Sequence, residues 1–437
     1  MEYLIMHIVG ARPNFMKIAP LVKAIEEYNQ THSSHLDQVI VHTGQHYDEN
    51  MSELFFNQLG LPKPDINLEV GSASQAVQTA EIMVRFEKVL LQYQPDAIIV
   101  VGDVNSTIAC TLVASKIEYS TCNSQLVTCD LKRRKPLIVH VEAGLRSFDR
   151  TMPEEINRIL TDQLSDLLFT TEEDANENLK REGISSEKIF FVGNVMIDTL
   201  FQHLEKAKKS DILNRLGLID QRLRTSNQGL STRDYALSTS DQGLSTRDYA
   251  LSTPYAVLTL HRPSNVDHKD TFLNILEALK EISKKIPIIF PAHPRTQNRI
   301  KLFSLENYFI NPSTRDYGLS TKHSCIYCIE PLGYLDFLWL MANAKLVLTD
   351  SGGIQEETTV LGIPCVTIRE NTERPITVKM GTNIVAGTKK EDIINAAFSQ
   401  LNKPNKPNNA TNPIPLWDGQ AAKRIVKILV NKLRCEA

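Results

Sequence analysis

The segment Ala97-Ile-Ile-Val-Val101, followed by Gly102-Asp103 and then by Asn105-Ser106-Thr107, decides the fold class. Five consecutive apolar residues predict a strand that is buried on both faces, which is typical of a parallel sheet covered by helices. The glycine and the aspartate predict a turn, and the polar triplet predicts the cap of a following helix. The segment is therefore one strand–turn–helix unit of an α/β protein.

The same unit recurs along the whole chain. Strands are expected at residues 3–9, 38–42, 97–101, 137–141, 167–170, 189–192, 256–260, 286–290, 346–349 and 365–368. Strand–helix alternation throughout predicts two doubly wound domains, each with a parallel sheet. We expect these domains at residues 1–198 and 254–401, with a linker at 199–253. Residues 402–437 are expected to form a Pro- and Asn-rich linker and an amphipathic helix at about 419–433, which docks on the first domain.

A nine-residue repeat interrupts this pattern. Ser-Thr-Arg-Asp-Tyr-Ala-Leu-Ser-Thr occurs at 231–239 and again at 245–253, and a copy with Gly in place of Ala occurs at 313–321. The repeat is too polar to order itself, and long surface loops cost little closure entropy, so we interpret the copies as loop insertions. The alternative is a binding surface built from the repeats. A second insertion is expected at about 118–135.

Composition excludes several classes of protein. The 437 residues include 48 Lys and Arg against 51 Asp and Glu, a net charge of −3, which argues against a nucleic-acid partner or an anionic membrane surface. No run approaches the ~20 apolar residues that span a membrane, and the N-terminus does not resemble a signal peptide. Seven scattered cysteines indicate reduced thiols and a cytoplasmic location. Cys325-x-x-Cys328 lacks a second pair, so no metal site is expected.

Polar residues follow several of the predicted strands in the first half of the chain. Ligands of open parallel sheets bind beyond the carboxyl ends of the strands, and a carboxylate placed there is costly unless it is paired or used. Asp103 and Glu142 each follow such a strand, and Glu154 opens a helix shortly afterwards. Arg12 and Lys17 lie in the turn and helix after the first strand. Two structural alternatives stay open: that Glu154 only complements a helix dipole, and that the two cations are surface charges.

The second half adds groups suited to a phosphate. His261 follows one strand, and Ser351-Gly352-Gly353 follows another and leads into a helix, whose N-terminus favours an anion. Neither a Walker A loop nor the G-x-G-x-x-G fingerprint occurs, so ATP hydrolysis and NAD chemistry are not supported. These residues together predict a ligand with a phosphate and a polar reacting end, bound between the two domains.

Several motifs together resemble the non-hydrolysing UDP-N-acetylglucosamine 2-epimerases, over nearly the whole chain outside the insertions. They are Gly10-Ala-Arg-Pro-Asn-Phe-Met-Lys17, Thr43-Gly-Gln-His46, Gly102-Asp103, Val141-Glu-Ala-Gly-Leu-Arg-Ser147, Pro153-Glu-Glu155, Leu260-His-Arg262, Asp350-Ser-Gly-Gly-Ile-Gln-Glu-Glu357 and Thr372-Glu-Arg-Pro375. The resemblance implies two Rossmann-like domains facing a cleft, of the glycosyltransferase-B type, in a homodimer. It also implies interconversion of UDP-GlcNAc and UDP-ManNAc without metal or redox cofactor.

The resemblance assigns site residues by matching position. The catalytic carboxylates fall on Asp103, Glu142 and Glu154, and His261 is counted with them. The contacts to UDP fall on Arg12, Lys17, His261, Phe337, Ser351, Gly352, Gly353, Glu357 and Arg374. Some members bind a second UDP-GlcNAc as an effector, and the matching positions are Gln45, His46, Arg262 and His293. Leu332 departs from members that carry glutamine there, so any contact at that point must come from the backbone.

The chemistry implied is elimination followed by re-addition. Departure of UDP from C1 acidifies the C2 hydrogen, whose loss gives a 2-acetamidoglucal, and a proton then returns to the other face. The step needs charge neutralisation at the diphosphate and an acid and a base at C2. Which carboxylate takes which role stays open. A UDP-sugar glycosyltransferase, a hydrolysing 2-epimerase and a non-catalytic UDP-sugar sensor are the alternatives.

Overall fold

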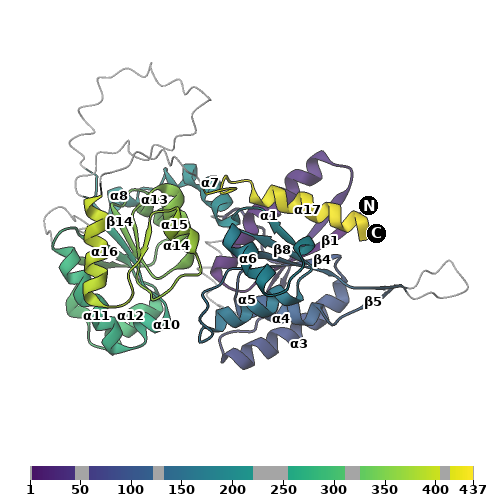
Figure 1. Cartoon of the computed structure of the whole chain (residues 1–437), viewed down its shortest axis with the longest axis horizontal. Coiled ribbons are helices and arrows are strands. Elements are labelled where there is room, and N and C mark those ends of the chain that lie inside the picture. Colours follow the sequence, from purple (N-terminus) through teal and green to yellow (C-terminus); the bar gives the residue numbers. More distant parts are fainter. Residues whose placement is uncertain are drawn as a thin grey trace, which may run out of the picture. The chain divides into compact units, whose positions relative to one another are not determined.

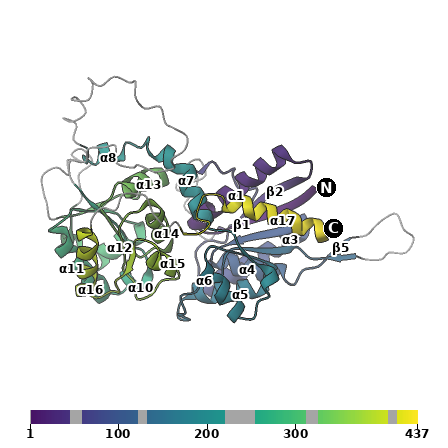
Figure 2. The ribbon, with the colours of Figure 1, turned by 45° about the horizontal axis from the view of Figure 1, so that its top comes forward.

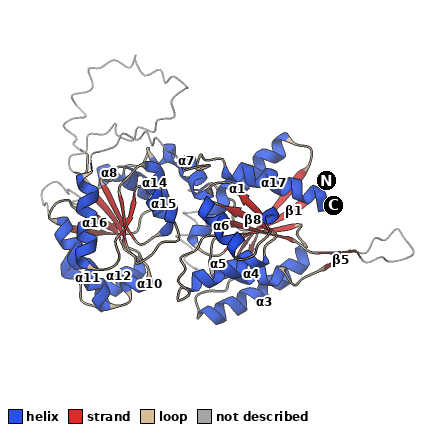
Figure 3. Ribbon diagram, in the orientation of Figure 1, coloured by secondary structure: helices blue, strands red, loops and turns tan. Residues whose placement is uncertain are grey.

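The structure is a computed structural model that describes residues 2–44, 59–121, 132–219, 254–310, 325–403 and 414–436. The chain divides into two compact units, residues 1–202 with 415–437 and residues 203–414. Each unit contains one seven-stranded sheet with helices around it (Figure 1 and Figure 3).

The first unit alternates strands and helices in the way the sequence predicts. Its strands are β1 (Glu2–Val9), β2 (His35–His42), β3 (Ile66–Asn67), β4 (Ala97–Val101), β5 (Tyr119–Thr121), β6 (Lys132–Arg134), β7 (Leu137–Ala143), β8 (Leu167–Thr170) and β9 (Ile189–Phe191). Its helices are α1 (Arg12–Thr31), α3 (Gln75–Tyr93), α4 (Asn105–Ala114), α5 (Pro153–Leu164), α6 (Glu173–Arg181) and α17 (Ala421–Glu436), with a 3-10 turn at Ser186–Lys188. Helix α7 (Val195–Ala207) crosses from this unit into the second.

The second unit repeats the alternation. Its strands are β10 (Ala256–Thr259), β11 (Ile288–Pro291), β12 (Phe309–Ile310), β13 (Ile326–Ile329), β14 (Leu346–Thr349), β15 (Cys365–Thr367) and β16 (Asn383–Val385). Its helices are α8 (Ile212–Arg215), α10 (Pro263–Val266), α11 (Lys269–Ser283), α12 (Pro294–Leu302), α13 (Tyr334–Ala342), α14 (Gly352–Leu361), α15 (Pro375–Lys379) and α16 (Lys390–Asn402), with a 3-10 turn at Glu306–Tyr308.

Both seven-stranded sheets are parallel throughout. The strand orders are β3-β2-β1-β4-β7-β8-β9 and β12-β13-β11-β10-β14-β15-β16. This confirms the α/β class with two doubly wound parallel sheets, and every apolar run used in the prediction forms a strand. The facing cleft that the resemblance implies stays a prediction.

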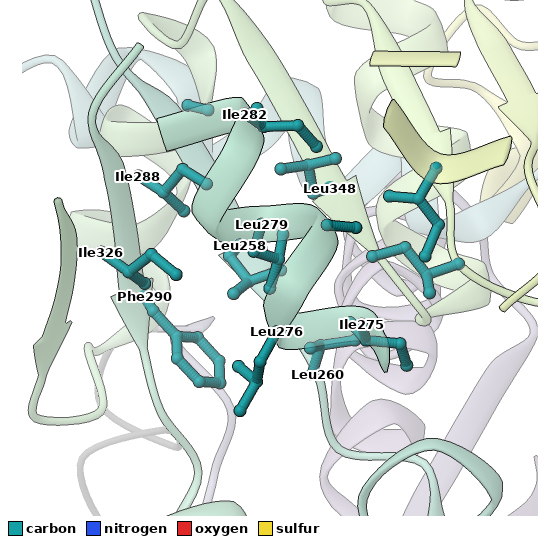
Figure 4. Close-up of a cluster of buried hydrophobic side chains, with 14 of the residues drawn as sticks. Leu258, Leu260, Ile275, Leu276, Leu279, Ile282, Ile288, Phe290, Ile326 and Leu348 are labelled. Carbon is teal, nitrogen blue, oxygen red and sulfur yellow. The ribbon is translucent and has the colours of Figure 1, made fainter. Parts of the chain in front are cut away.

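Buried helix faces explain how the sheets are covered. In α11 the apolar residues Phe272, Ile275 and Leu279 recur at helical spacing and are fully buried, as expected for one face of an amphipathic helix. They pack on side chains of the adjacent strands, Leu258 from β10 and Leu348 from β14 among them (Figure 4). Burial of each such side chain contributes about 1.5–3 kcal/mol to folding.

The C-terminal helix belongs to the first unit. Helix α17 contacts α1, and both views place the two helices side by side (Figure 1 and Figure 2). The Asp198 carboxylate accepts hydrogen bonds from the backbone N–H groups of Ala421 (3.1 Å) and Ala422 (2.7 Å) at the start of this helix. A residue from α7 therefore caps a helix more than two hundred positions away.

The start of the expected linker is helical, and the expected insertions lie only partly within the described residues. Residues 199–219 are not an extended linker, because α7 continues through Ala207 with Leu200 and Leu204 buried, and α8 follows. The ends of the 118–135 segment form the antiparallel pair β5–β6, and all three repeat copies lie outside the described residues. Among the described residues no helix is long and apolar enough to cross a membrane.

Candidate active site

Three neighbouring strands of the first unit place the predicted carboxylates. β1, β4 and β7 are adjacent and parallel, so their carboxyl ends meet at one edge of the sheet. Gly102 comes directly after β4 and Asp103 comes next, and Glu142 is the second-last residue of β7. The fold thus gathers two acids that are 39 positions apart in sequence at the edge where ligands of such sheets bind.

Glu142 has an unusual backbone that sets its direction. Its φ is +75°, which is rare for a residue with a side chain, and the pairing of β7 with β8 shifts register between Val141 and Ala143. Such a bulge turns one side chain out of the regular pleat. The carboxylate Oε2 lies 2.7 Å from Nζ of Lys17, and both side chains are more than nine-tenths buried. The lysine compensates the charge of a carboxylate that would be costly to bury alone.

Gly102 leaves the space that Lys17 occupies. A Cβ atom at this position would lie 2.7 Å from the lysine Nζ, and the backbone has a φ of +67°. The left-handed backbone and the close lysine both favour glycine at this turn. Asn14, one turn before Lys17, accepts from the backbone N–H of Gly10 and Ala11 and donates to the carbonyl of Val101 at 3.0 Å. These bonds fix the start of α1 against the end of β4.

Asp103 is held by an arginine that the sequence analysis did not single out. Arg158, from α5, donates to Oδ2 of Asp103 and also to Oε2 of Glu155 at 2.6 Å. Glu155 accepts as well from the backbone N–H groups of Ser147 (3.0 Å) and Phe148 (2.9 Å). Burial raises the pKa of Glu155, but the bonds from Ser147, Arg158 and Phe148 outweigh it, so its pKa lies below the ordinary value.

The neighbouring acid, Glu154, is in a different environment. It is half-buried in the first turn of α5, whereas Glu155 is buried. Arg158 therefore serves a structural carboxylate and a predicted catalytic one together, while Glu154 is the more accessible acid of the pair. Arg12 begins α1, and its side chain lies outside the described part of the molecule, as do Gln45 and His46.

In the second unit, a buried aspartate organises the histidine turn. Asp350 is fully buried at the end of β14 and accepts from the backbone N–H of His261 (3.0 Å) and of Arg262 (2.9 Å), which follow the adjacent strand β10. Nδ1 of His261 lies 3.0 Å from Oδ1 of the same carboxylate, and the imidazole is 48% exposed. Burial raises the pKa of Asp350, but His261 and the two N–H donors outweigh it, so its pKa lies below the ordinary value. Asp350 thus orients a histidine that remains accessible to a ligand.

The predicted phosphate cradle forms the N-terminus of α14. Ser351 is the N-cap residue, and Gly352 and Gly353 are the first residues of the helix. A Cβ atom on Gly352 would lie 2.7 Å from Oε1 of Glu373, so a larger residue here would displace that carboxylate. Glu373 pairs with Arg369 at 2.8 Å and with Arg262 at 3.3 Å. Burial raises the pKa of Glu373, but the surrounding arginines outweigh it and hold it far below its ordinary value.

Three more of the assigned contacts lie in this unit. Arg374 pairs with the fully buried Glu356 at 2.6 Å, and Phe337 is half-buried on α13. Glu357 is buried on α14 and accepts a hydrogen bond from the hydroxyl of Tyr334 at 3.1 Å. Burial, with a contribution from neighbouring Glu356, raises the pKa of Glu357 to about 7. A carboxyl group that is protonated part of the time near neutral pH can both donate to and accept from hydroxyl groups of a ligand.

The two described residues of the expected effector site also lie in the second unit. Arg262 donates through Nε to the carbonyl of Asp350 at 3.0 Å. His293 is the exposed N-cap residue of α12, and its Nδ1 accepts from the backbone N–H of Arg295 at 3.2 Å. Both therefore have structural roles in addition to the one that the resemblance implies. No group of three or more His, Cys, Asp or Glu side chains among the described residues is arranged to hold a metal ion.

Sequence reasoning missed the partners that hold the site. Arg158, Glu155, Asp350 and Glu373 are buried charged residues within or next to the motifs, and they act by pairing. The signal available in the sequence was the position of Arg158. It comes four residues after Glu154, so both residues lie on the same face of the predicted helix. It does not reveal which strand-end acid the arginine meets.

Comparison with known proteins places this geometry in a family. The family model described as UDP-N-acetylglucosamine 2-epimerase matches residues 29–123 and 129–430. The UDP-N-acetylglucosamine 2-epimerase of Methanocaldococcus jannaschii is 41% identical over 424 residues, which cover 97% of each chain. The UDP-2,3-diacetamido-2,3-dideoxy-D-glucuronate 2-epimerase of Pseudomonas aeruginosa is 37% identical over 428 residues, covering 97% of this chain and 99% of that protein.

A solved structure agrees with the sequence comparison. The crystal structure of the M. jannaschii UDP-GlcNAc 2-epimerase in complex with UDP-GlcNAc and UDP superposes with a TM-score of 0.75 at 39% identity, covering 99% of this chain and 100% of that one. The family model covers parts of both units, and the two relatives and the solved structure each match 97% or more of this chain. This chain therefore belongs to the UDP-N-acetylglucosamine 2-epimerase family.

Proposed function

We propose that the chain interconverts UDP-GlcNAc and UDP-ManNAc by elimination and re-addition of UDP. The observation that carries the proposal is the pair of strand-end carboxylates, Asp103 and Glu142, each held by a buried cation in the first unit. With Glu154 they supply acids and bases for the sugar. The second unit supplies the groups suited to a diphosphate, around the N-terminus of α14.

The proposed reaction breaks two bonds and re-forms them. The C1–O bond breaks with its electron pair leaving on UDP, and a carboxylate takes the C2 proton, which gives a 2-acetamidoglucal. A proton is then delivered to the opposite face of C2, and the UDP oxygen adds back to C1. Positive groups at the diphosphate stabilise the charge that develops as the bond breaks, and this role is assigned to His261 and the Ser351–Gly353 backbone in the proposal.

The roles of the individual acids remain part of the proposal. Asp103 and Glu142 are ion-paired and so are suited to be carboxylate bases. Glu154 is half-buried, and no ion pair involves it among the described residues, which suits a group that gives up and regains a proton. Arg12, Lys17, Phe337, Glu357 and Arg374 are proposed to contact the substrate.

The relative from P. aeruginosa suggests a second substrate. Its name specifies a UDP-sugar with a second acetamido group and a carboxylate, and its identity to this chain is close to that of the M. jannaschii protein. The same elimination chemistry would serve both sugars. We favour UDP-GlcNAc because the more similar of these two relatives and the superposed structure both carry that name.

Product analysis with two candidate substrates, with and without an added acceptor, distinguishes the candidate functions. The chain is mixed with UDP-GlcNAc or with UDP-2,3-diacetamido-2,3-dideoxy-glucuronate, and the products are followed by proton NMR. The proposal predicts UDP-ManNAc from the first substrate. Free ManNAc with UDP would indicate a hydrolysing enzyme, turnover only with an added acceptor would indicate a glycosyltransferase, and no product from either substrate would indicate a sensor.

We also propose an effector site, a homodimer and a cytoplasmic location. A second UDP-GlcNAc would contact Gln45, His46, Arg262 and His293, and it would activate only by binding the active conformation more tightly. A lag in the conversion of pure UDP-ManNAc, removed by a trace of UDP-GlcNAc, would support this site. The five described cysteines are free thiols, as expected in a reducing compartment.

The face of α3 supports the homodimer. Val77, Val84 and Leu91 recur every seven residues on this helix and are 53%, 57% and 46% exposed. A heptad-spaced apolar stripe on a surface helix is suited to packing against another helix. We propose that the stripe meets the same stripe of a second copy of the chain, since such a symmetric contact is the commonest route to a dimer.

A further inference from the structure

A fully buried histidine lies directly beneath the turn that carries Asp103. His140 is in the middle of β7, two residues before Glu142, and its side chain is 0% exposed. Its Nδ1 lies 2.6 Å from Oδ1 of Asp162, and its Nε2 lies 2.8 Å from the carbonyl oxygen of Gly102. Both ring nitrogens therefore have a close oxygen partner.

Both partners of the ring accept hydrogen bonds. A carbonyl oxygen can only accept, and the Asp162 carboxylate also accepts from Arg146 (2.7 Å) and from the backbone N–H of Gly144 (3.1 Å) at its other oxygen. Burial raises the pKa of Asp162, but His140 and Arg146 outweigh it, so its pKa lies below the ordinary value. A neutral imidazole has only one N–H, so a ring that faces a carbonyl and an ionised carboxylate needs a proton on each nitrogen to donate to both.

The charges around the ring balance when the histidine is an imidazolium. Arg146 also pairs with Glu182, through Nε at 2.8 Å and through Nη2 at 2.6 Å. The chain of groups then alternates in sign from His140 through Asp162 and Arg146 to Glu182. A neutral His140 would leave this network with an excess negative charge against the sheet, which is costly in a buried site.

The ring holds one particular peptide group. Gly102 is in the left-handed region with a φ of +67°, its N–H donates to the carbonyl of Val141 at 3.1 Å, and its own carbonyl faces His140. β7 thus fixes both sides of Gly102. The carbonyl belongs to the peptide that joins Gly102 to Asp103, so rotation of this peptide would displace Asp103.

We propose that His140, as a buried imidazolium, is a positioning residue that holds the Gly102–Asp103 peptide and so sets the placement of the Asp103 carboxylate. Asp162 and Arg146 hold the imidazolium in turn. The inference rests on the proposed function, in which Asp103 reacts with the sugar. His140 itself touches no substrate in this account.

His7 provides a matched control in the same sheet. It lies on β1, is also 0% exposed, and its Nε2 is 2.9 Å from Oε1 of Gln38. Burial lowers the pKa of His7 to about 4, so this ring is neutral at pH 7. The two buried histidines should therefore differ in protonation, and only one of them supports the Asp103 turn.

The first test reads the protonation directly in the wild-type protein. Long-range proton–nitrogen correlation spectra of histidine-labelled protein at about pH 8 should show one imidazolium with both nitrogens protonated. Its signals should disappear in H140Q and persist in H7Q. A spectrum at this pH in which every histidine is neutral overturns the proposal, because Asp162 would then carry the shared proton. The presence or absence of an imidazolium is read from the wild-type spectrum alone. It therefore does not depend on the activity of the enzyme or on the folding of a variant.

The second test separates positioning from folding. In H140Q, Asp162 keeps Arg146, and we expect kcat to fall about 10²-fold, the typical effect of displacing a reacting group by about 1 Å. KM and the affinity for UDP should stay at the wild-type values, and H7Q should leave kcat unchanged. Wild-type kcat in H140Q would overturn the proposal. If H140Q instead loses kcat, UDP affinity and melting temperature together, His140 serves the fold alone. That outcome would also overturn the proposal. If wild-type protein does not epimerise UDP-GlcNAc, the proposed function fails while the imidazolium signature stands.

Discussion

Nζ of Lys17 lies 2.7 Å from Oε2 of Glu142, and both side chains are almost completely buried. The lysine comes from the second turn of α1, and the glutamate comes from a bulge at the end of β7 with a left-handed backbone. The pair joins two elements at the edge of the sheet where the proposed reaction takes place. The charge balance of this pair makes a buried carboxylate possible at a position that the proposed chemistry needs.

Removing one partner of this pair should destabilise the first unit. K17M leaves the Glu142 charge buried without compensation, which typically costs about 3–5 kcal/mol in free energy of unfolding. In the double variant K17M/E142Q the loss should be smaller than the sum of the two single losses. Denaturant unfolding of the four proteins gives these values. K23M, at an exposed position of the same helix, is the control, and equal stability of K17M and K23M would show that the pair contributes nothing.

The three carboxylates should act on turnover and not on nucleotide affinity. D103N, E142Q and E154Q should each lower kcat by about 10²–10⁴-fold, as expected when a positioned acid or base is lost. The affinity for UDP, measured by calorimetry, should be unchanged because none of the three carboxylates is among the groups proposed to contact UDP. E173Q, an exposed acid in the first turn of α6, serves as the control. Any carboxylate whose amide variant turns over normally leaves the catalytic set.

Glu357 should give the second unit a distinct pH dependence. Its pKa is raised from 4.5 to about 7, so between these pH values the folded protein keeps a proton that the unfolded chain has released. The stabilisation from that proton is complete below about pH 4.5 and is lost as the pH rises to about 7. E357Q cannot titrate, so its free energy of unfolding should fall less over this range, by about 3 kcal/mol at most. Denaturant unfolding at several pH values tests this, with the exposed E306Q as control; parallel curves for wild type and E357Q would contradict it.

The α3 stripe should govern the association state. V84E places a charge at the centre of the stripe of Val77, Val84 and Leu91 and should shift the protein toward monomer in analytical ultracentrifugation. V378E changes an equally apolar side chain that is 43% exposed on α15 of the second unit, and it should leave the association state unchanged. A wild-type protein that sediments as a monomer, or a V84E protein that remains a dimer, would exclude this face as the contact.

The sheets could be predicted because their signal is local. Strands such as Ala97–Val101 are continuous apolar runs, which identifies them as central parallel strands. The missed strands β3, β12 and β16 are two or three residues long and lie at or next to sheet edges, where little apolar sequence is needed. Strand β13 is also absent from the prediction, although Cys328 of the Cys325-x-x-Cys328 motif lies in this strand.

The support of the site could not be predicted because it depends on contacts between distant segments. Nothing near Asp103 in sequence indicates that Arg158 pairs with it, and nothing near His140 indicates the carboxylate of Asp162. The left-handed backbone of Glu142 follows from a register shift between two strands, which a single sequence does not reveal. The acids were found from their place after buried strands and from the family motifs, whereas their partners required the fold.

The most direct test of the account is the fate of the hydrogen on C2. Wild-type protein is incubated with UDP-GlcNAc in D2O, and the nucleotide sugars are examined by proton NMR and mass spectrometry. Elimination and re-addition predict UDP-ManNAc that carries deuterium at C2, because the proton removed from one face exchanges with solvent before a proton returns to the other. UDP-ManNAc formed with its original hydrogen still at C2, or no epimer at all, would contradict the account.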